Sequence, residues 1–282
     1  MTKLTATPLA VALLAAVALP LGAADWSDTF LGYRTSSEFR EPGIDGTVGK
    51  NILQLGHASG WAYGSNFFNV DMLMSDKGDP AANGKTGANE VYVVYRGGLS
   101  LGKLTGKNLG FGPVRDLSIT GGFDFNSKDN AFASKKRFLV LGPTFHLAVP
   151  KGFWDLSVFA CHEQNYNGIV GKSVDYKTTW ELSTAWGIPF QVGSVGAEFK
   201  GYANYIGAKG KDGFGVETKP ETLANLSLLF DISPVFGAEN KVFVGGGFEY
   251  WNNKFGGQNS DAPAPATNRR VTAPMAQLQI HF

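Results

Sequence analysis

Charge, cysteine and long apolar runs are all scarce in this 282-residue chain. Charged residues make up 17% of it, with 25 Lys and Arg against 24 Asp and Glu. Because neither sign is in clear excess, the composition indicates neither a nucleic-acid-binding protein nor an acidic solvating tail. The single cysteine, Cys161, excludes an intramolecular disulfide. No metal-type spacing surrounds it, so we expect it to be a packed small side chain.

The N-terminal segment has the layout of a secretory signal peptide. An early lysine precedes the apolar run at residues 9–21, and cleavage is expected after Ala24. The alternative is a membrane anchor, but this run of about 13 residues is shorter than the ~20 that a spanning helix needs, and Pro20 interrupts it. We predict a signal peptide over residues 1–24 and one domain over 25–282. No later apolar run could form a spanning helix, so the exported chain is either soluble in the periplasm or spans a membrane as a barrel.

The rest of the chain has the features of many short strands. Glycine is frequent, with 37 residues, and aromatics make up 13%. Apolar and polar residues alternate with a period of two, as where Ile119 and Phe125 alternate with Thr120 and Asp124. The segments have lengths near the ~9–11 residues of a tilted membrane strand. The predicted strands are the twelve segments 26–40, 50–60, 65–75, 89–101, 114–126, 135–148, 153–165, 174–187, 193–207, 222–232, 240–252 and 271–282.

Connection lengths separate a membrane barrel from a soluble sandwich. Outer-membrane barrels alternate short periplasmic turns with long external loops, and this chain follows that pattern with both termini on the periplasmic side. The connection at Gly102–Pro113 is longer than the pattern predicts. The short turns are predicted at Gly60–Gly64, Val149–Gly152 and Gly187–Val192, and the long loops at 76–88, 166–173, 208–221 and 253–270.

Aromatic residues near strand ends favour the same conclusion. Their amphipathic rings suit the headgroup depth of a bilayer. Phe282 is a C-terminal aromatic on the apolar face of its strand, which resembles the signal read by the barrel-assembly machinery. We therefore predict an all-β fold, a closed antiparallel transmembrane β-barrel of twelve strands. We expect it in the Gram-negative outer membrane, in contact with lipid and lipopolysaccharide. The aromatics concerned are Trp26, Phe30, Tyr95, Trp154, Trp180, Trp186, Tyr250 and Trp251.

Several stretches resemble the Tsx-like family of nucleoside-specific channel-forming outer membrane proteins, and they keep its segment order over essentially the whole mature chain. The resemblance implies a monomeric twelve-stranded barrel with a narrow, substrate-selective passage for nucleosides. No nucleoside-contacting residue is carried over from the family to a position here. The stretches are WSDTFLGYR (26–34), SNFFNVDML (65–73), EVYVVYR (90–96), LSLGKLTGKNLGFGPVRD (99–116), NYIGAKGKDGFGVETKPETL (204–223) and EYWNNKFG (249–256).

Charges of both signs collect opposite the apolar faces of the predicted strands. A Lys or Arg facing lipid at the bilayer midplane costs ~2–4 kcal/mol, so these charges are expected inside the barrel. There they either line a passage or form salt bridges that only stabilise the barrel. Aromatics such as Phe67, Phe159 and Tyr202 could stack a base or sugar ring, at ~1–3 kcal/mol per base. The candidate lumen residues are Asp71, Arg96, Asp124, Lys200, Tyr202 and Glu249.

Signals for an enzyme are weak. The four histidines are scattered, and neither HExxH nor GxSxG occurs. The string at Gly102–Gly110 resembles a phosphate loop but lacks its GK[ST] ending. We therefore expect no enzyme, no cofactor, no metal and no nucleic-acid partner. The predicted function is passive, selective diffusion of small polar solutes, nucleosides first. The alternative is a surface receptor whose loops at 208–221 and 253–270 bind a phage, a bacteriocin or a host surface.

Overall fold

The computed structural model describes residues 24–257 and 269–282. Apart from Ala24, the predicted signal peptide lies outside the described residues, as does most of the low-complexity stretch 256–270. No helix within the described ranges has the length and apolar composition needed to cross a membrane.

The described residues are mostly β-strands. All twelve predicted strands are present, with boundaries that shift by a few residues. A thirteenth, β8, has four residues and pairs only with β7. The strands are β1 (Trp26–Phe39), β2 (Val48–Trp61), β3 (Gly64–Ser75), β4 (Asn89–Ser100), β5 (Val114–Lys128), β6 (Arg137–Leu147), β7 (Phe153–Asn167), β8 (Lys172–Asp175), β9 (Thr179–Val192), β10 (Val195–Ile206), β11 (Glu221–Asp231), β12 (Val242–Asn252) and β13 (Val271–His281).

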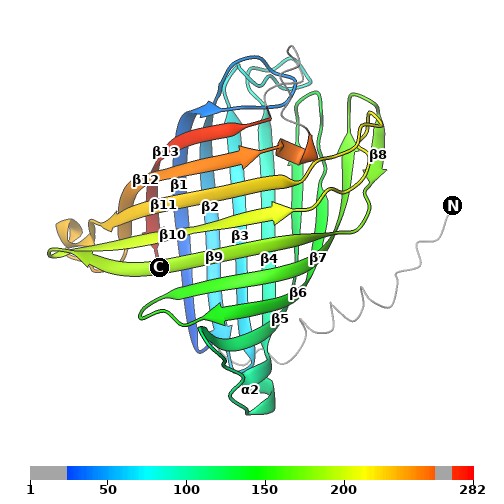
Figure 1. Ribbon diagram of the computed structural model, residues 1–282. Helices are drawn as coiled ribbons and strands as arrows, with labels where there is room; N and C mark the ends of the chain where they lie inside the picture. Colours follow the sequence, from blue (N-terminus) through cyan, green and yellow to red (C-terminus); the bar gives the residue numbers. More distant parts are fainter. Residues whose placement is uncertain (1–23, 258–268) are drawn as a thin grey trace.

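Apart from β8, every strand pairs antiparallel with two neighbours. The pairs follow chain order, β1 pairs with β13, and β6 pairs with β7, so the twelve longer strands close with no open edge. The fold is therefore the predicted closed antiparallel barrel of twelve strands, seen from the side in Figure 1. Closure satisfies the backbone hydrogen-bonding groups that an edge strand would expose to lipid.

The connections differ in length between the two ends of the barrel. One end carries the loops 40–47, 76–88, 129–136, 168–178 and 207–220 and the described loop residues 253–257 and 269–270, toward the upper right of Figure 1. The other end carries the chain termini and the shorter connections 62–63, 148–152 and 193–194, with 101–113 and 232–241. By the outer-membrane pattern, the long loops mark the extracellular end and the termini the periplasmic end.

The predicted turn at Gly187–Val192 is wrong. β9 runs to Val192, and the turn is at residues 193–194. Gly187 and Pro189 resembled turn residues, but Ile188 and Phe190 continue the outward apolar alternation and pair with β10. The register of the barrel therefore outweighed local turn propensity. β9 begins at Thr179, five residues later than predicted, and the preceding residues 172–175 pair with β7 as β8.

The long periplasmic connection after β4 contains a one-turn helix, α2 (Leu101–Thr105), which the strand pattern did not predict. The Ser100 side chain accepts a hydrogen bond from the Lys103 backbone N–H at 3.0 Å. Gly106 ends the helix with a φ of 65°, a conformation that favours glycine. Good capping at both ends explains why so short a helix forms.

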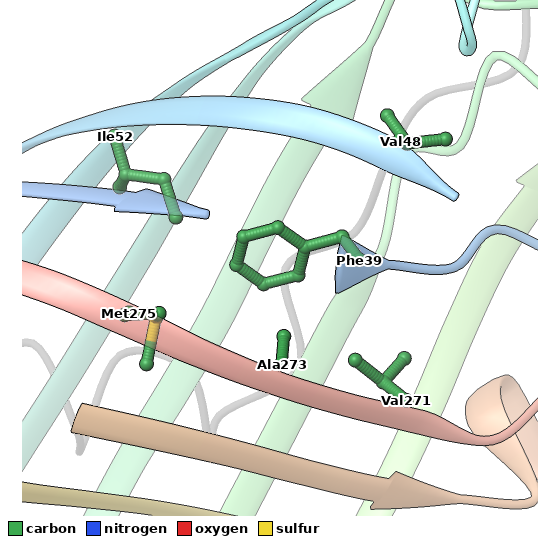
Figure 2. Packing of buried hydrophobic residues seen from close by; sticks show 6 residues of the cluster. All are labelled: Phe39, Val48, Ile52, Val271, Ala273 and Met275. Carbon is green, nitrogen blue, oxygen red and sulfur yellow. The ribbon is translucent and has the colours of Figure 1, made fainter. Parts of the chain in front are cut away.

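Part of the barrel interior is apolar, which the sequence pattern did not indicate. A buried cluster lies beneath the extracellular loops, where Phe39 packs toward residues of β2 and β13 (Figure 2). Three residues predicted for the outer aromatic girdle lie on the inward face by register, namely Trp26, Phe30 and Trp251. Phe30 stacks on His281, and Trp251 packs against the cluster. The cluster consists of Phe39, Val48, Ile52, Val271, Ala273 and Met275.

Candidate functional site in the barrel lumen

The pairing register separates an inward from an outward face around the whole barrel. Directly paired residues share a face, and the alternation stays in phase around the barrel apart from two register shifts near strand ends, between Ser36 and Phe39 and between Val114 and Asp116. Among the charged residues of the barrel strands, only Glu38, Arg115 and Arg137 lie off the inward face, each within two residues of a strand end. The outward face of the described strands otherwise carries no Asp, Glu, Lys or Arg and is rich in apolar residues such as Leu31, Leu53 and Leu55, as lipid contact requires.

The inward face carries more acids than bases. Its five bases within strands are Arg34, Lys50, Arg96, Lys128 and Lys200. Its twelve acids are Asp28, Asp71, Glu90, Asp116, Asp124, Asp155, Glu163, Glu181, Glu198, Glu221, Asp231 and Glu249.

All six candidate residues lie on this inward face, and four of them are in ion pairs. Asp71 on β3 pairs with Arg34 on β1, across the intervening β2. Arg96 and Asp124 pair at 2.7 Å, and the Tyr92 hydroxyl donates to Asp124 at 3.1 Å. These contacts favour the structural alternative for Asp71, Arg96 and Asp124. Whether they also line a passage stays a prediction.

Lys200 reaches across the interior. Its ammonium group pairs with Glu198 at 3.0 Å and also donates to Gln279 on β13, past β11 and β12. The same group lies 5.2 Å from the ring centroid of Phe30. The Lys200 side chain therefore contacts residues of β10, β13 and β1, and it narrows this part of the lumen.

Tyr202 and Glu249 are the two candidates without an ion pair among the described residues. Tyr202 is 37% exposed although it faces inward. Its hydroxyl lies in the electrostatic field of Arg34 and Glu249. The only hydrogen bond given to the Glu249 carboxylate within residues 24–257 and 269–282 is a long one, 3.4 Å from Asn225 Nδ2. These two side chains therefore keep hydrogen-bonding capacity.

The aromatic candidates differ from one another. Phe67 pairs in register with Arg96 and is 40% exposed, so its ring is accessible on the inward face. Phe159 instead is buried in an apolar cluster with Phe138, Val140, Cys161 and Ile206, so the expectation that it offers a stacking face is wrong. Cys161 is buried there, as expected for a packed small side chain.

Glu181 belongs to the site although it was not among the six candidates. It is 1% exposed, and neither carboxylate oxygen has a hydrogen-bond partner in the described chain. Its register partners are Phe159 and Ile206 of the apolar cluster. Alternation placed it inward, but nothing in the sequence distinguishes an unpaired carboxylate from a paired one.

Buried ion pairs join the loops at the extracellular end. Glu41, just after β1, accepts from Lys50, from Lys128 at 3.3 Å and from Lys254 at 3.1 Å. Lys128 also pairs with Asp79 of the loop after β3. Burial alone would raise the pKa of Glu41, but the three ammonium groups outweigh it and hold the pKa well below its usual value. We call these five residues the mouth cluster.

A second set of ion pairs lies beside the mouth cluster. Lys209 pairs with Glu163 and lies 3.7 Å from Glu221. Trp251 Nε1 donates to Glu221 at 2.7 Å, and Lys254 lies 4.7 Å from the Trp251 ring centroid. The two sets therefore meet at Trp251. Sequence analysis missed Glu41, Asp79, Lys209 and Lys254, because loop residues carry no alternation signal.

A cavity of about 290 Å³ lies at the periplasmic end. Its walls include Asp28, Glu198, Phe243 and His281, and His281 pairs with Asp28 at 2.9 Å. No group of three or more potential His, Cys, Asp or Glu metal ligands occurs within residues 24–257 and 269–282. The chemistry on offer is therefore hydrogen bonding, charge and ring contact.

Known proteins resemble the chain along most of its length. It is 26% identical over 268 residues to outer membrane protein OmpK of Vibrio parahaemolyticus serotype O3:K6, covering 90% of this chain and 92% of that protein. A second Vibrio parahaemolyticus OmpK is 25% identical over 260 residues, covering 88% and 90%. No protein-family model matches the chain.

Solved structures with related shapes are more distant. The KdgM porin has a TM-score of 0.42 at 13% identity, covering 90% of this chain and 99% of that one. The translocator domain of the Neisseria meningitidis autotransporter NalP has a TM-score of 0.46 at 12% identity, covering 98% and 95%. The barrel assignment rests on the strand pairing of this chain.

The closed barrel and the similarity to OmpK together support an outer-membrane, multi-strand barrel location. Neither relative's name refers to nucleosides. The resemblance to the Tsx-like family therefore stays a prediction.

Proposed function

We propose that this protein is an outer-membrane channel for the passive, selective diffusion of small polar solutes, with nucleosides as the first class to test. In this proposal the solute crosses the barrel without being chemically changed. A barrel of twelve strands lies between small barrels filled by side chains and wide porins with 16–18 strands, so a few side chains can make its lumen selective.

The observation that carries the proposal is the inward, 37% exposed ring of Tyr202 on the same wall as Glu249, whose carboxylate accepts only one long hydrogen bond from the described chain. A base could stack on this ring while ribose hydroxyls donate to Glu249. Stacking of a base on an aromatic ring is worth ~1–3 kcal/mol. Phe67 offers a second accessible ring on the same inward face.

The test is solute flux into liposomes, run with a panel of nucleosides and sugars of similar size. Tyr202→Ala should slow nucleosides several-fold and leave sugars nearly unchanged. Tyr205→Ala is the matched control, because Tyr205 lies on the same strand and is similarly exposed, but on the outward face. Heat-modifiable gel mobility reports whether each variant is folded.

Two outcomes would count against the proposal in different ways. If folded wild-type protein passes none of the solutes, it is not a diffusion channel. If it passes sugars and nucleosides equally and Tyr202→Ala slows both alike, the channel stands and the preference for nucleosides does not.

One observation favours a receptor role as the second candidate. In the loop 207–220, Asp212 accepts from the backbone N–H groups of Phe214 and Val216, at 2.9 Å each. The two apolar side chains are 49% and 59% exposed. Exposed apolar side chains on an ordered loop suit protein contact. Folded protein that binds a phage or bacteriocin through Phe214 and passes no solute would favour this candidate over the channel.

A further inference from the structure

The interior of the barrel is richer in acids than in bases. Within the barrel strands, twelve acids and five bases share the inward face. Loop residues that contact the inward groups add three bases, Lys136, Lys209 and Lys254, and two acids, Glu41 and Asp79. The acids therefore still outnumber the bases. The interior therefore carries a formal negative excess, although the chain as a whole has a formal net charge of only +1.

Almost all of the inward bases have a carboxylate partner, whereas several of the inward acids have no basic partner among the described residues. Arg34, Arg96 and Lys200 each have a carboxylate partner, and so do the lysines of the mouth cluster. Lys136 is the exception among the inward bases of the described chain. It donates to the Tyr92 hydroxyl at 3.3 Å and lies 4.6 Å from the Phe138 ring centroid.

Five inward acids of the described strands have no ion pair, and Glu90, Asp116 and Asp231 among them accept close hydrogen bonds from side-chain or backbone donors. The other two, Glu181 and Glu249, lie on one wall. Tyr202 on β10, Asn225 on β11 and Glu249 on β12 are direct cross-strand partners. Glu181 lies on neighbouring β9, two inward positions closer to the extracellular loops than Ala185, which pairs with Tyr202. We call these four residues the acceptor wall. No ion pair within 4.0 Å is formed by Glu181 or Glu249 in residues 24–257 and 269–282.

An unpaired carboxylate at a buried position with apolar neighbours destabilises the folded protein. Glu181 is 1% exposed, and its neighbours in register are the apolar Phe159 and Ile206. A buried carboxylate without a partner is destabilising, and a positively charged or donor-rich group beside it removes much of that cost. Rings of Asp and Glu are also the usual device by which a pore favours cations.

We propose that the lumen is selective for small cations and amine-bearing solutes, and that Glu181 and Glu249 set this selectivity. The inference rests on the proposed function, since it needs a passage. Glu249 is only partly buried, so a solute in the lumen would contact its carboxylate directly. The Glu181 carboxylate, which accepts no hydrogen bond from the described chain, would then pair with the cationic group of the solute.

The experiment is conductance of the purified protein in planar bilayers under a KCl gradient, repeated with methylammonium chloride. The reversal potential gives the cation-to-chloride permeability ratio. Wild type should favour both cations over chloride several-fold. Glu181→Gln and Glu249→Gln should each lower the ratio at least twofold, and the double variant should bring it close to one.

Glu38→Gln is the matched control, since Glu38 is exposed and lies off the inward face at the end of β1. It should leave the permeability ratio unchanged. Glu181→Asp keeps the charge and should retain most of the cation preference, which separates charge from packing.

The results of this experiment separate failure of the channel proposal from failure of the cation selectivity. If folded wild-type protein does not conduct, the channel proposal fails and this inference fails with it. If it conducts with no cation preference, or prefers chloride, only this inference is overturned. If wild type prefers cations but both Gln variants keep the wild-type ratio, the assignment to Glu181 and Glu249 is wrong. Should Glu181→Gln not fold, the same test on Glu249→Gln decides.

Discussion

The mouth cluster and the acceptor wall use the same residue types in opposite ways. In the mouth cluster one carboxylate, Glu41, is shared by three lysines, and the groups are buried. On the acceptor wall, Glu181 and Glu249 have no basic partner among the described residues. Breaking a buried pair leaves an uncompensated charge, so the mouth cluster holds the loops in place. The unpaired carboxylates of Glu181 and Glu249 form no ion pair that links strands or loops of the described chain, so they stay available to a solute.

The largest effect is expected at the centre of the mouth cluster. Glu41→Gln would leave Lys50, Lys128 and Lys254 without their shared carboxylate and should cost about 3–5 kcal/mol of unfolding free energy. Chemical denaturation of the protein in lipid vesicles measures this cost. Glu38→Gln, at an exposed position three residues away, should change the free energy by less than about 0.5 kcal/mol. Equal denaturation midpoints for the two variants would contradict the comparison.

Acid should weaken the mouth cluster through the same residue. The folded-state pKa of Glu41 is held well below its usual 4.5 by Lys254, Lys50 and Lys128, despite its burial. A depressed pKa stabilises the folded protein above the unfolded-state value, and this stabilisation is lost as pH falls through the folded pKa. The difference in denaturation midpoint between wild type and Glu41→Gln should therefore be constant above pH 4.5 and shrink below it. A difference that grew on acidification would have the wrong sign.

An intermediate effect is expected where a lumen charge is paired but partly hydrated. Arg96→Gln removes the partner of Asp124, which keeps the Tyr92 hydroxyl at 3.1 Å. We expect a loss of about 2 kcal/mol, in the range of a hydrogen bond to a charged group. Adding Asp124→Asn should recover part of the loss, because no unpaired carboxylate remains. Strictly additive losses in this double-mutant cycle would show that the two side chains are not coupled.

The smallest effect on stability is expected on the acceptor wall. Glu249→Gln removes a charge whose only hydrogen bond from the described chain is 3.4 Å long. Denaturation midpoints should stay within about 0.5 kcal/mol of wild type. A loss of several kcal/mol would show that Glu249 is a structural charge like Glu41, and the contrast between the two regions would disappear.

Alternation predicted which residues face inward with considerable success. Asp124 between Phe123 and Phe125 and Glu249 between Phe248 and Tyr250 lie on the inward face, because a period of two leaves a strand residue only two directions. Residue type misassigned Trp26, Phe30 and Trp251 to the membrane interface, although their parity places them on the inward face. Alternation could not predict α2, whose single turn depends on Ser100 and Gly106 rather than on periodicity.

The sequence by itself determined the strands, their inward and outward faces and the alternation of short turns with long loops, because these depend on residues close together in the chain. Only the tertiary structure decided which inward charges are paired. Arg34 reaches Asp71 across β2, and Lys254 reaches Glu41, 213 residues earlier in the chain. Such partners are brought together by closure of the barrel and by the loops that fold over its end. The physical reason is that a period-two pattern specifies the direction of a side chain, whereas the distance between two charges depends on the register of every strand between them.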